Sequence, residues 1–165
     1  MYCFGKEGKA MMLLGTHTPT IDAQYRISFP AKFRTLLGEE FLIVRHLENP
    51  CLRFYSLTEW EKYLERLESY LDQGDLEDVL EYYYSDSVNG TPDSLGRVRI
   101  PKELWKCIDV DPEDEDAKQI VVTGCGKYGE IWRKSAYEAH KNSRRTAELN
   151  AKVRACPSKA KNDEQ

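Results

Sequence analysis

The sequence predicts an α+β fold in which one short β-rich unit occurs twice, with a helical hairpin inserted between the copies. The main observation is an internal repeat: residues 21–33 and 92–104 share Asp, Arg, a β-branched residue, an apolar residue and Pro in register. The likeness continues downstream, where apolar runs at 42–44 and 120–122 are each followed by a segment with aromatic residues. Agreement over successive elements indicates a duplicated structural unit rather than a chance match.

Each copy has the same predicted order: a short strand, a tight loop headed by aspartate, a second strand, a helix begun by proline, and a closing pair of strands. Apolar–polar–apolar alternation predicts the second strand, and proline suits the first helical position because its φ is already fixed. In the first copy these elements are expected at 20–21, 22–26, 27–29, 30–37, 41–47 and 51–55. In the second copy they are expected just before Asp93, then at 93–97, 98–100, 101–107, 119–124 and 129–133.

The two loops differ at one position that governs their shape. Gly96 suits a left-handed backbone conformation without strain, whereas Tyr25 occupies the same place in the first copy. The first loop is therefore expected either to accept some strain or to have another shape.

An amphipathic helical hairpin is predicted between the copies. Its first apolar face consists of Trp60, Leu64, Leu67 and Leu71, and its second consists of Leu76, Val79, Leu80 and Tyr83. Gly74 is expected to break the first helix, with Asp75 capping the next. Capping boxes are expected at Ser56, Thr58 and Ser135.

The predicted organisation has five parts. These are an N-terminal extension at 1–11, a first unit at 12–57, a helical hairpin at 58–90, a second unit at 91–140 and a basic C-terminal helix or tail at 141–165. The last residues, from about Cys156, are expected to be frayed.

Charge is distributed unevenly along the chain. The net charge of −4 argues against a protein that coats DNA through overall basicity. Residues 59–86 carry ten acids and two bases, a net of −8, whereas residues 133–161 carry nine bases and two acids, a net of +7. This asymmetry indicates faces with different partners, and a pair of solvated surfaces would give the same pattern.

Composition indicates a globular protein. Hydrophobic residues make up 41% and charged residues 32%, which is typical of folded chains. No apolar run is long enough to span a bilayer, and residues 1–10 lack the apolar stretch of a signal peptide. Five scattered cysteines without framework spacing indicate reduced thiols. We therefore expect a cytoplasmic location and no membrane partner.

No catalytic or metal-binding constellation is predicted. The cysteines and the three histidines are dispersed, so neither a metal nor another cofactor is expected. Residues 124–129 are glycine-rich like a phosphate loop, but Lys127 lacks a following Ser or Thr, and a hairpin turn explains the glycines better. Cys125 could act as a nucleophile only with a histidine brought close in space. We expect no enzyme and no small-molecule substrate.

The doubled Asp-x-x-x-Arg loop is the strongest functional feature. It places Arg26 and Arg97 at equivalent ends of two equivalent strands, near the basic residues Lys32, Arg34, Arg99 and Lys102. An arginine on a rigid turn can bond bidentately to guanine or pair with phosphate. In the alternative interpretation each aspartate only braces its loop by pairing with the arginine. Both can hold at once, since a carboxylate that orients an arginine helps it to read a base.

At these motifs the sequence resembles the MraZ family. Residues 13–34 resemble the family's opening, residues 93–101 its second signature, and residues 122–132 the strand pair that follows, and the likeness spans about 12–140. The resemblance implies two tandem AbrB-like swapped-hairpin β units and assembly into rings of many subunits. Tyr25 departs from the glycine usual in the family, and residues 1–11 precede the family's usual start.

The resemblance also implies a DNA-binding transcription regulator that is cytoplasmic and associated with the nucleoid. Family members bind short tandem direct repeats of double-stranded DNA in the promoter of the division and cell-wall gene cluster and regulate that cluster. The loops that read DNA correspond to residues 22–26 and 93–97. The residues implied to contact DNA are Asp22, Gln24, Arg26, Lys32, Arg34, Asp93, Arg97, Arg99 and Lys102.

Two other functions stay open at this point. The chain could be an oligomeric adaptor that binds a protein partner through the acidic hairpin, in which case loss of Arg26 and Arg97 would leave its function unchanged. An enzyme would need an unexpected pocket with converging cysteine or histidine side chains.

Overall fold

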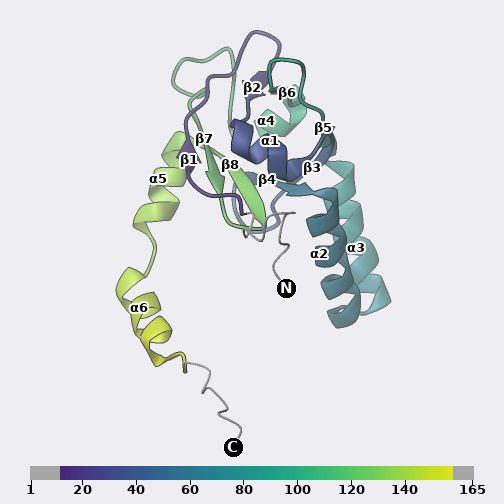
Figure 1. Ribbon diagram of the computed structural model, residues 1–165, viewed down its shortest axis with the longest axis vertical. Coiled ribbons are helices and arrows are strands. Elements are labelled where there is room, and N and C mark those ends of the chain that lie inside the picture. Colours follow the sequence, from purple (N-terminus) through teal and green to yellow (C-terminus); the bar gives the residue numbers. More distant parts are fainter. Residues whose placement is uncertain (1–11, 158–165) are drawn as a thin grey trace, which may run out of the picture.

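The structure, a computed structural model, describes residues 12–157, so the N-terminal extension at 1–11 and residues 158–165 lie outside the described part. A six-stranded antiparallel sheet is combined with a separate two-stranded ribbon and surrounding helices (Figure 1). The predicted α+β class is confirmed. Within the described part, no helix is both long and apolar enough to cross a membrane.

The two copies contain equivalent elements. The first copy consists of β1 (Thr16–His17), β2 (Arg26–Ser28), α1 (Ala31–Leu37), β3 (Phe41–Arg45) and β4 (Cys51–Ser56). The second consists of β5 (Ser87–Gly90), β6 (Arg97–Arg99), α4 (Lys102–Cys107), β7 (Ile120–Gly124) and β8 (Tyr128–Arg133). Between them lie α2 (Leu57–Tyr70) and α3 (Gln73–Ser85), and the chain continues into α5 (Lys134–Asn142) and α6 (Thr146–Ala155).

The strand order of the large sheet shows how the copies interlock. The order is β1-β7-β8-β4-β3-β5, which reads the same in both directions when equivalent strands of the two copies are exchanged. At the edges, β1 pairs with β7 of the second copy and β5 pairs with β3 of the first. At the centre, β4 pairs with β8. Each copy therefore supplies an edge strand to the other, as in a swapped hairpin.

The ribbon of β2 and β6 joins the copies a second time. Ile27 pairs with Val98 in the antiparallel register, and both side chains are buried. They belong to a core formed with α1, α4 and one face of the sheet, whose largest buried side chains include Phe33, Phe41, Phe54 and Trp105. The outgoing strands of both loops are thus fixed to one shared core.

The α2–α3 hairpin covers part of the opposite face of the sheet. Its base packs through an aromatic cluster in which Trp60 lies edge-on to Tyr55 and to Tyr83. The hydroxyl groups of Tyr63 and Tyr83 are 2.9 Å apart and share a hydrogen bond. In Figure 1 the hairpin extends away from the end of the molecule that carries β2 and β6.

Two predicted positions in the repeat were wrong. The first strand is Thr16–His17, because Thr16 pairs with Thr123 and His17 with Val122, whereas residues 20–21 are irregular after Pro19, which has no N–H to donate to a sheet. The prolines precede the helices instead of occupying their first helical position. Pro30 has an extended ψ of 142° and its carbonyl accepts from the N–H of Arg34, as expected of an N-cap, and Pro101 has the same role before α4.

The helix caps were predicted only in part. The Ser56 hydroxyl accepts from the N–H of Glu59 at 3.2 Å, as expected, but Thr58 lies inside α2 and Ser135 inside α5. The helix α2 ends at Tyr70, before Gly74, and Asp72 rather than Asp75 caps α3 by accepting from the N–H of Asp75. A carboxylate at the N-cap can accept from the free N–H three residues later, and it is better placed for this than a carboxylate already within the first turn.

Candidate nucleic-acid interface

The first loop is organised around the carboxylate of Asp22. Its Oδ1 accepts from the backbone N–H groups of Gln24 and Arg26, each at 2.9 Å, and its Oδ2 accepts from Nε of Arg26 at 2.7 Å. The backbone closes the turn, since the N–H of Asp22 donates to the carbonyl of Arg26 at 3.0 Å. One side chain therefore fixes both the loop backbone and the arginine.

The second loop repeats this arrangement. Oδ1 of Asp93 accepts from the N–H groups of Leu95 (3.0 Å) and Arg97 (2.9 Å), and Oδ2 accepts from Nε of Arg97 at 2.9 Å. The N–H of Asp93 donates to the carbonyl of Arg97 at 2.9 Å. The pairing of each aspartate with its own arginine, which was one of the two interpretations, is thus present in both loops. It occupies Nε of each arginine, so Nη1 and Nη2 can donate to other partners.

Tyr25 and Gly96 have the same backbone conformation. The φ of Tyr25 is 62° and that of Gly96 is 76°. Of the two alternatives for the first loop, the structure has the strained one: the loop keeps the shape of its partner, and a tyrosine occupies the left-handed region at a cost of roughly 1–2 kcal/mol. The tyrosine ring is half-buried against the core and lies 5.9 Å from Nζ of Lys102.

The two loops lie side by side because their outgoing strands pair. Arg26 is opposite Arg99, and Arg97 is opposite Ser28. The N–H of Phe29 donates to the carbonyl of Gly96, and the N–H of Ile100 donates to that of Tyr25, so the contacts are reciprocal. Figure 1 shows β2 and β6 next to each other at one end of the molecule.

The loop hydrogen bonds favour ionised carboxylates. Loss of solvent alone would raise the pKa of Asp22, but the N–H groups of Arg26 and Gln24 and the Arg26 guanidinium outweigh it and hold that pKa below its ordinary value. The backbone N–H of Arg97 is the largest cause that lowers the pKa of Asp93. Both loops are therefore held in the charged, arginine-paired state at neutral pH.

The remaining candidates fall into two groups. Arg34 and Lys102 are engaged with the loops: Nε of Arg34 donates to the carbonyl of Phe29, its guanidinium fills the space where a Cβ on Gly96 would lie, and Lys102 lies near Tyr25 and 4.0 Å from Glu113. By contrast, Gln24, Lys32 and Arg99 are exposed. The structure thus places Gln24, Arg34, Arg99 and Lys102 at the two loops and Lys32 on the neighbouring segment α1.

Charge differs between the two ends of the molecule. Residues 18–34 and 91–106 together carry seven bases and three acids, a net of +4, against −8 for residues 59–86. In Figure 1 the loops and the acidic hairpin lie at opposite ends. A negative overall charge is therefore compatible with a locally basic end that an anion can approach.

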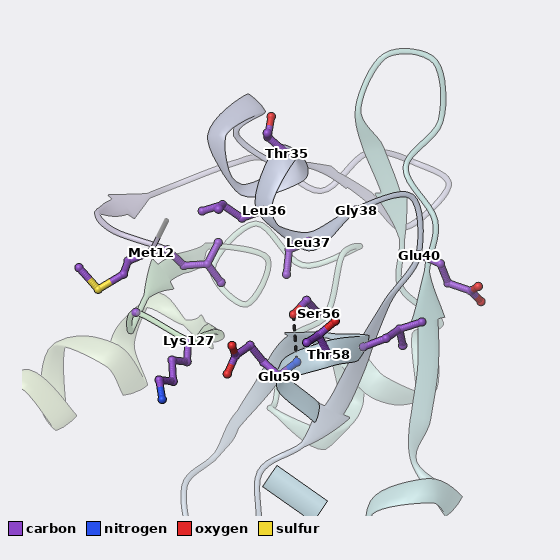
Figure 2. Close-up of a pocket in the computed structure, with 13 residues that line it drawn as sticks. Met12, Thr35, Leu36, Leu37, Gly38, Glu40, Ser56, Thr58, Glu59 and Lys127 are labelled. Carbon is purple, nitrogen blue, oxygen red and sulfur yellow. Dashed lines mark hydrogen bonds between the residues drawn. The ribbon is translucent and has the colours of Figure 1, made fainter. Parts of the chain in front are cut away.

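A groove lies between α1, the start of α2 and the β7–β8 turn. Its volume is 420 Å³, and Figure 2 shows Leu36 and Leu37 of α1 on one side of it, with Lys127 and Glu59 on another. Its 13 lining residues include neither cysteine nor histidine. The described residues contain no group of three or more His, Cys, Asp or Glu side chains suited to a metal ion.

Sequence reasoning missed a buried polar cluster around Glu130. Its carboxylate accepts from Nε of Arg53 at 3.1 Å and from the thiols of Cys51 and Cys125 at 3.4 and 3.5 Å. Cys125 is exposed as a residue, but loss of solvent around its sulfur is the main cause that raises its pKa to about 12, so this thiol is a poor nucleophile at neutral pH. Residues 124–129 form the turn of the β7–β8 hairpin, as expected. Spacing in the sequence gave no signal for the cluster, because β4 and β8 meet only in the folded sheet.

The interlocked strands and the doubled loops define the chain as a duplicated α+β protein of the swapped-hairpin type. A family model described as MraZ protein matches residues 12–80. "Transcriptional regulator MraZ" of Dictyoglomus thermophilum is 31% identical over 147 residues, covering 86% of this chain and 96% of that relative. The proteins of the same name from Dictyoglomus turgidum and Caldanaerobacter subterraneus are 34% and 33% identical, covering 77% and 80% of this chain and 83% and 88% of those relatives. The chain belongs to the MraZ family, whose named members here are transcriptional regulators.

Proposed function

We propose that this chain is a transcriptional regulator that binds double-stranded DNA sequence-specifically through the loops 22–26 and 93–97. Arg26 and Arg97 read base edges in the major groove, and the bound sites are short tandem direct repeats in the promoter of the division and cell-wall gene cluster. The protein acts as a homo-oligomer, arranged as a ring, in the cytoplasm and on the nucleoid.

The observation that carries the proposal is the paired orientation of the two arginines. Each guanidinium donates through Nε to an aspartate, at 2.7 Å for Arg26 and 2.9 Å for Arg97. A guanidinium held by one edge keeps its other N–H groups for two parallel hydrogen bonds, the geometry that matches O6 and N7 of guanine. Part of each arginine side chain is open to solvent, 24% for Arg26 and 33% for Arg97.

The surrounding bases support phosphate contacts. Lys32 on α1 and Arg99 opposite Arg26 are exposed and suit direct, sequence-independent contacts to the DNA backbone. Gln24 is exposed within the first loop and suits adenine or phosphate. Arg34, Lys102, Asp22 and Asp93 contribute mainly by holding the loops in position.

An oligomer suits repeated sites. Each loop pair offers few base contacts, and linking several pairs raises the overall affinity because later contacts are effectively intramolecular. The spacing of the direct repeats then selects the arrangement of subunits.

The proposal is tested by fluorescence anisotropy at fixed, near-physiological salt, with duplexes carrying the tandem repeats upstream of the gene and with scrambled duplexes. Wild type should prefer the repeats by about a hundredfold, which is about 2.7 kcal/mol and within reach of two bidentate pairs. Arg26→Ala/Arg97→Ala should remove that preference while the protein stays folded.

A matched control separates base reading from charge. Lys127→Ala/Lys134→Ala removes the same number of positive charges at exposed positions outside the loops and should keep the preference. If the loop variant keeps the preference, the arginines only brace the loops, and the adaptor function through the acidic hairpin becomes the better account.

A further inference from the structure

Helix α6 displays an apolar face that nothing covers in the described chain. Every residue from 141 to 157 is exposed, including Leu149 at 49% and Val153 at 71%. Isolated helices shorter than about 12–15 residues are marginal in water, because most helical stability comes from packing an apolar face. A helix of ten residues with two large exposed apolar side chains therefore calls for a packing partner.

The exposed face of α6 is bordered by positive charge. Leu149 and Val153 are four residues apart and lie on one face, and Arg145 and Lys152 lie next to Leu149 on that face, four residues before and three after it. In the single chain both bases pair with Glu148, at 3.1 and 3.2 Å. These are exposed pairs on a helix surface, which an acidic partner can replace at little cost.

The distal half of the α2–α3 hairpin has the complementary character. Residues 65–81 carry seven acids and one base, a net of −6. Two helices alone leave their apolar seam partly open, and Leu67, Leu71 and Leu76 are only half-buried. Tyr70, at the end of α2, is 88% exposed.

We propose that α6 of one copy of this chain docks on the α2–α3 hairpin of a second copy. Leu149 and Val153 cover the open leucine seam, and Arg145 and Lys152 pair with the acids beside it. Within one chain the two surfaces cannot serve each other in this arrangement, because α6 and the hairpin lie on opposite sides of the molecule (Figure 1). The contact joins two different surfaces, so it is head-to-tail and passes from copy to copy until a ring closes.

A protein partner fits these observations better than DNA does. A DNA backbone would match the bases of α6 but would leave Leu149 and Val153 without a role, since phosphate contacts need no apolar face. The loops also face the other end of the molecule, so DNA bound there does not run along α6. This inference rests on the oligomer proposed above and names the surfaces that would hold it together.

The test is a charge exchange on the full chain, followed by sedimentation velocity at low and high salt. Variant one is Arg145→Glu/Lys152→Glu, and variant two is Glu68→Lys/Asp78→Lys, at exposed hairpin positions that are not themselves cap residues. Each variant alone brings like charges together and should weaken association about tenfold or more, as disrupted charge pairs at interfaces do. An equimolar mixture again pairs opposite charges and should recover the wild-type assembly.

Two further variants keep the result interpretable. Leu149→Gln/Val153→Gln retains helix-forming residues but removes the apolar face, and it should also weaken association. Lys106→Glu/Lys127→Glu makes the same charge change at exposed positions on α4 and in the β7–β8 turn and should leave association at the wild-type level.

The outcomes separate the two proposals. A wild-type oligomer that neither charge variant weakens, or a mixture that does not recover, overturns the α6–hairpin contact and leaves the oligomer itself standing. A wild-type chain that sediments as a monomer overturns both the contact and the ring.

Discussion

Arg26 and Asp93 belong to different copies of the repeat, yet Nη1 of Arg26 lies 3.7 Å from Oδ2 of Asp93. The same oxygen accepts from Nε of Arg97 at 2.9 Å. One carboxylate oxygen therefore faces both arginines, and the two loops behave as a single unit. The pairing of β2 with β6 makes this contact possible by placing Arg26 opposite Arg99 and Arg97 opposite Ser28.

Asp93 should accordingly matter more for sequence preference than Asp22. Asp93→Asn keeps an oxygen for the turn N–H groups but loses the charge that orients both arginines, and we expect the ratio of specific to scrambled affinity to fall about tenfold. Asp22→Asn affects one arginine and should cost about threefold. Anisotropy on both duplexes measures the ratio. Each change also removes one negative charge near DNA, so an equal rise in affinity for both duplexes, with no change in the ratio, would contradict an orienting role.

Gly96 is predicted to be the least replaceable glycine near the loops. An added Cβ would strain a φ of +76° and would lie 2.5 Å from Cζ of Arg34. We expect Gly96→Ala to lower the free energy of unfolding by about 1–3 kcal/mol and to displace Arg34 from behind the loop. Urea unfolding gives the first effect and anisotropy the second.

Gly38→Ala is the matched control for that prediction. Its φ of +84° and ψ of −168° lie in a region that residues other than glycine rarely adopt, but its Cβ would meet nothing within 4 Å. It should therefore cost about 1–3 kcal/mol from backbone strain alone and leave DNA binding unchanged. Equal destabilisation by the two substitutions, with equal DNA binding, would show that the contact with Arg34 has no role.

The repeat in the sequence predicted the fold and the loops because the residues of each copy make the interactions that form these elements. The aspartate-headed turn, the proline and the strand pair all depend on neighbouring residues. The ion pair between Arg26 and Asp93 and the cluster of Cys51, Cys125 and Glu130 depend on β2–β6 and β4–β8 pairing, which no local pattern encodes. The first strand was misplaced for the same reason, since its position is set by its partner β7.

Glu130 should give the protein a pH-dependent stability. Burial alone would raise its pKa, but the Arg53 guanidinium and the hydrogen bonds from Arg53, Cys51 and Cys125 lower it below the ordinary value of 4.5. A carboxyl with a lowered folded-state pKa adds stability above its unfolded pKa and loses it as pH falls through the folded one. Glu130→Gln leaves Arg53 without its ion pair and should cost about 3 kcal/mol at pH 7.

Urea unfolding of wild type and Glu130→Gln over a pH series checks this prediction. The difference between them should be constant near neutrality and should shrink below the unfolded pKa of about 4.5. A difference that stays the same at all pH values would mean that the charge of Glu130 is not what stabilises the sheet there.

The cap of α2 offers a simpler test of the local structure. Ser56→Ala removes the acceptor of the Glu59 N–H and should lower the free energy of unfolding by about 1 kcal/mol. Ser135→Ala alters a serine inside α5 that is exposed and not at the cap, and it should have little effect. Comparable losses in the two variants would mean that the hydrogen bond to Ser56 contributes nothing measurable.

Whether Arg26 and Arg97 read base edges can be measured by removing the base acceptor that they would use. Guanines in a preferred duplex are replaced one at a time by 7-deazaguanine, which lacks N7 in the major groove, and anisotropy is measured with wild type and with each single arginine-to-alanine variant. At the guanine that an arginine contacts, wild type should lose about tenfold in affinity and the matching variant nothing further. If every replacement costs wild type and variants the same, the arginines do not read bases.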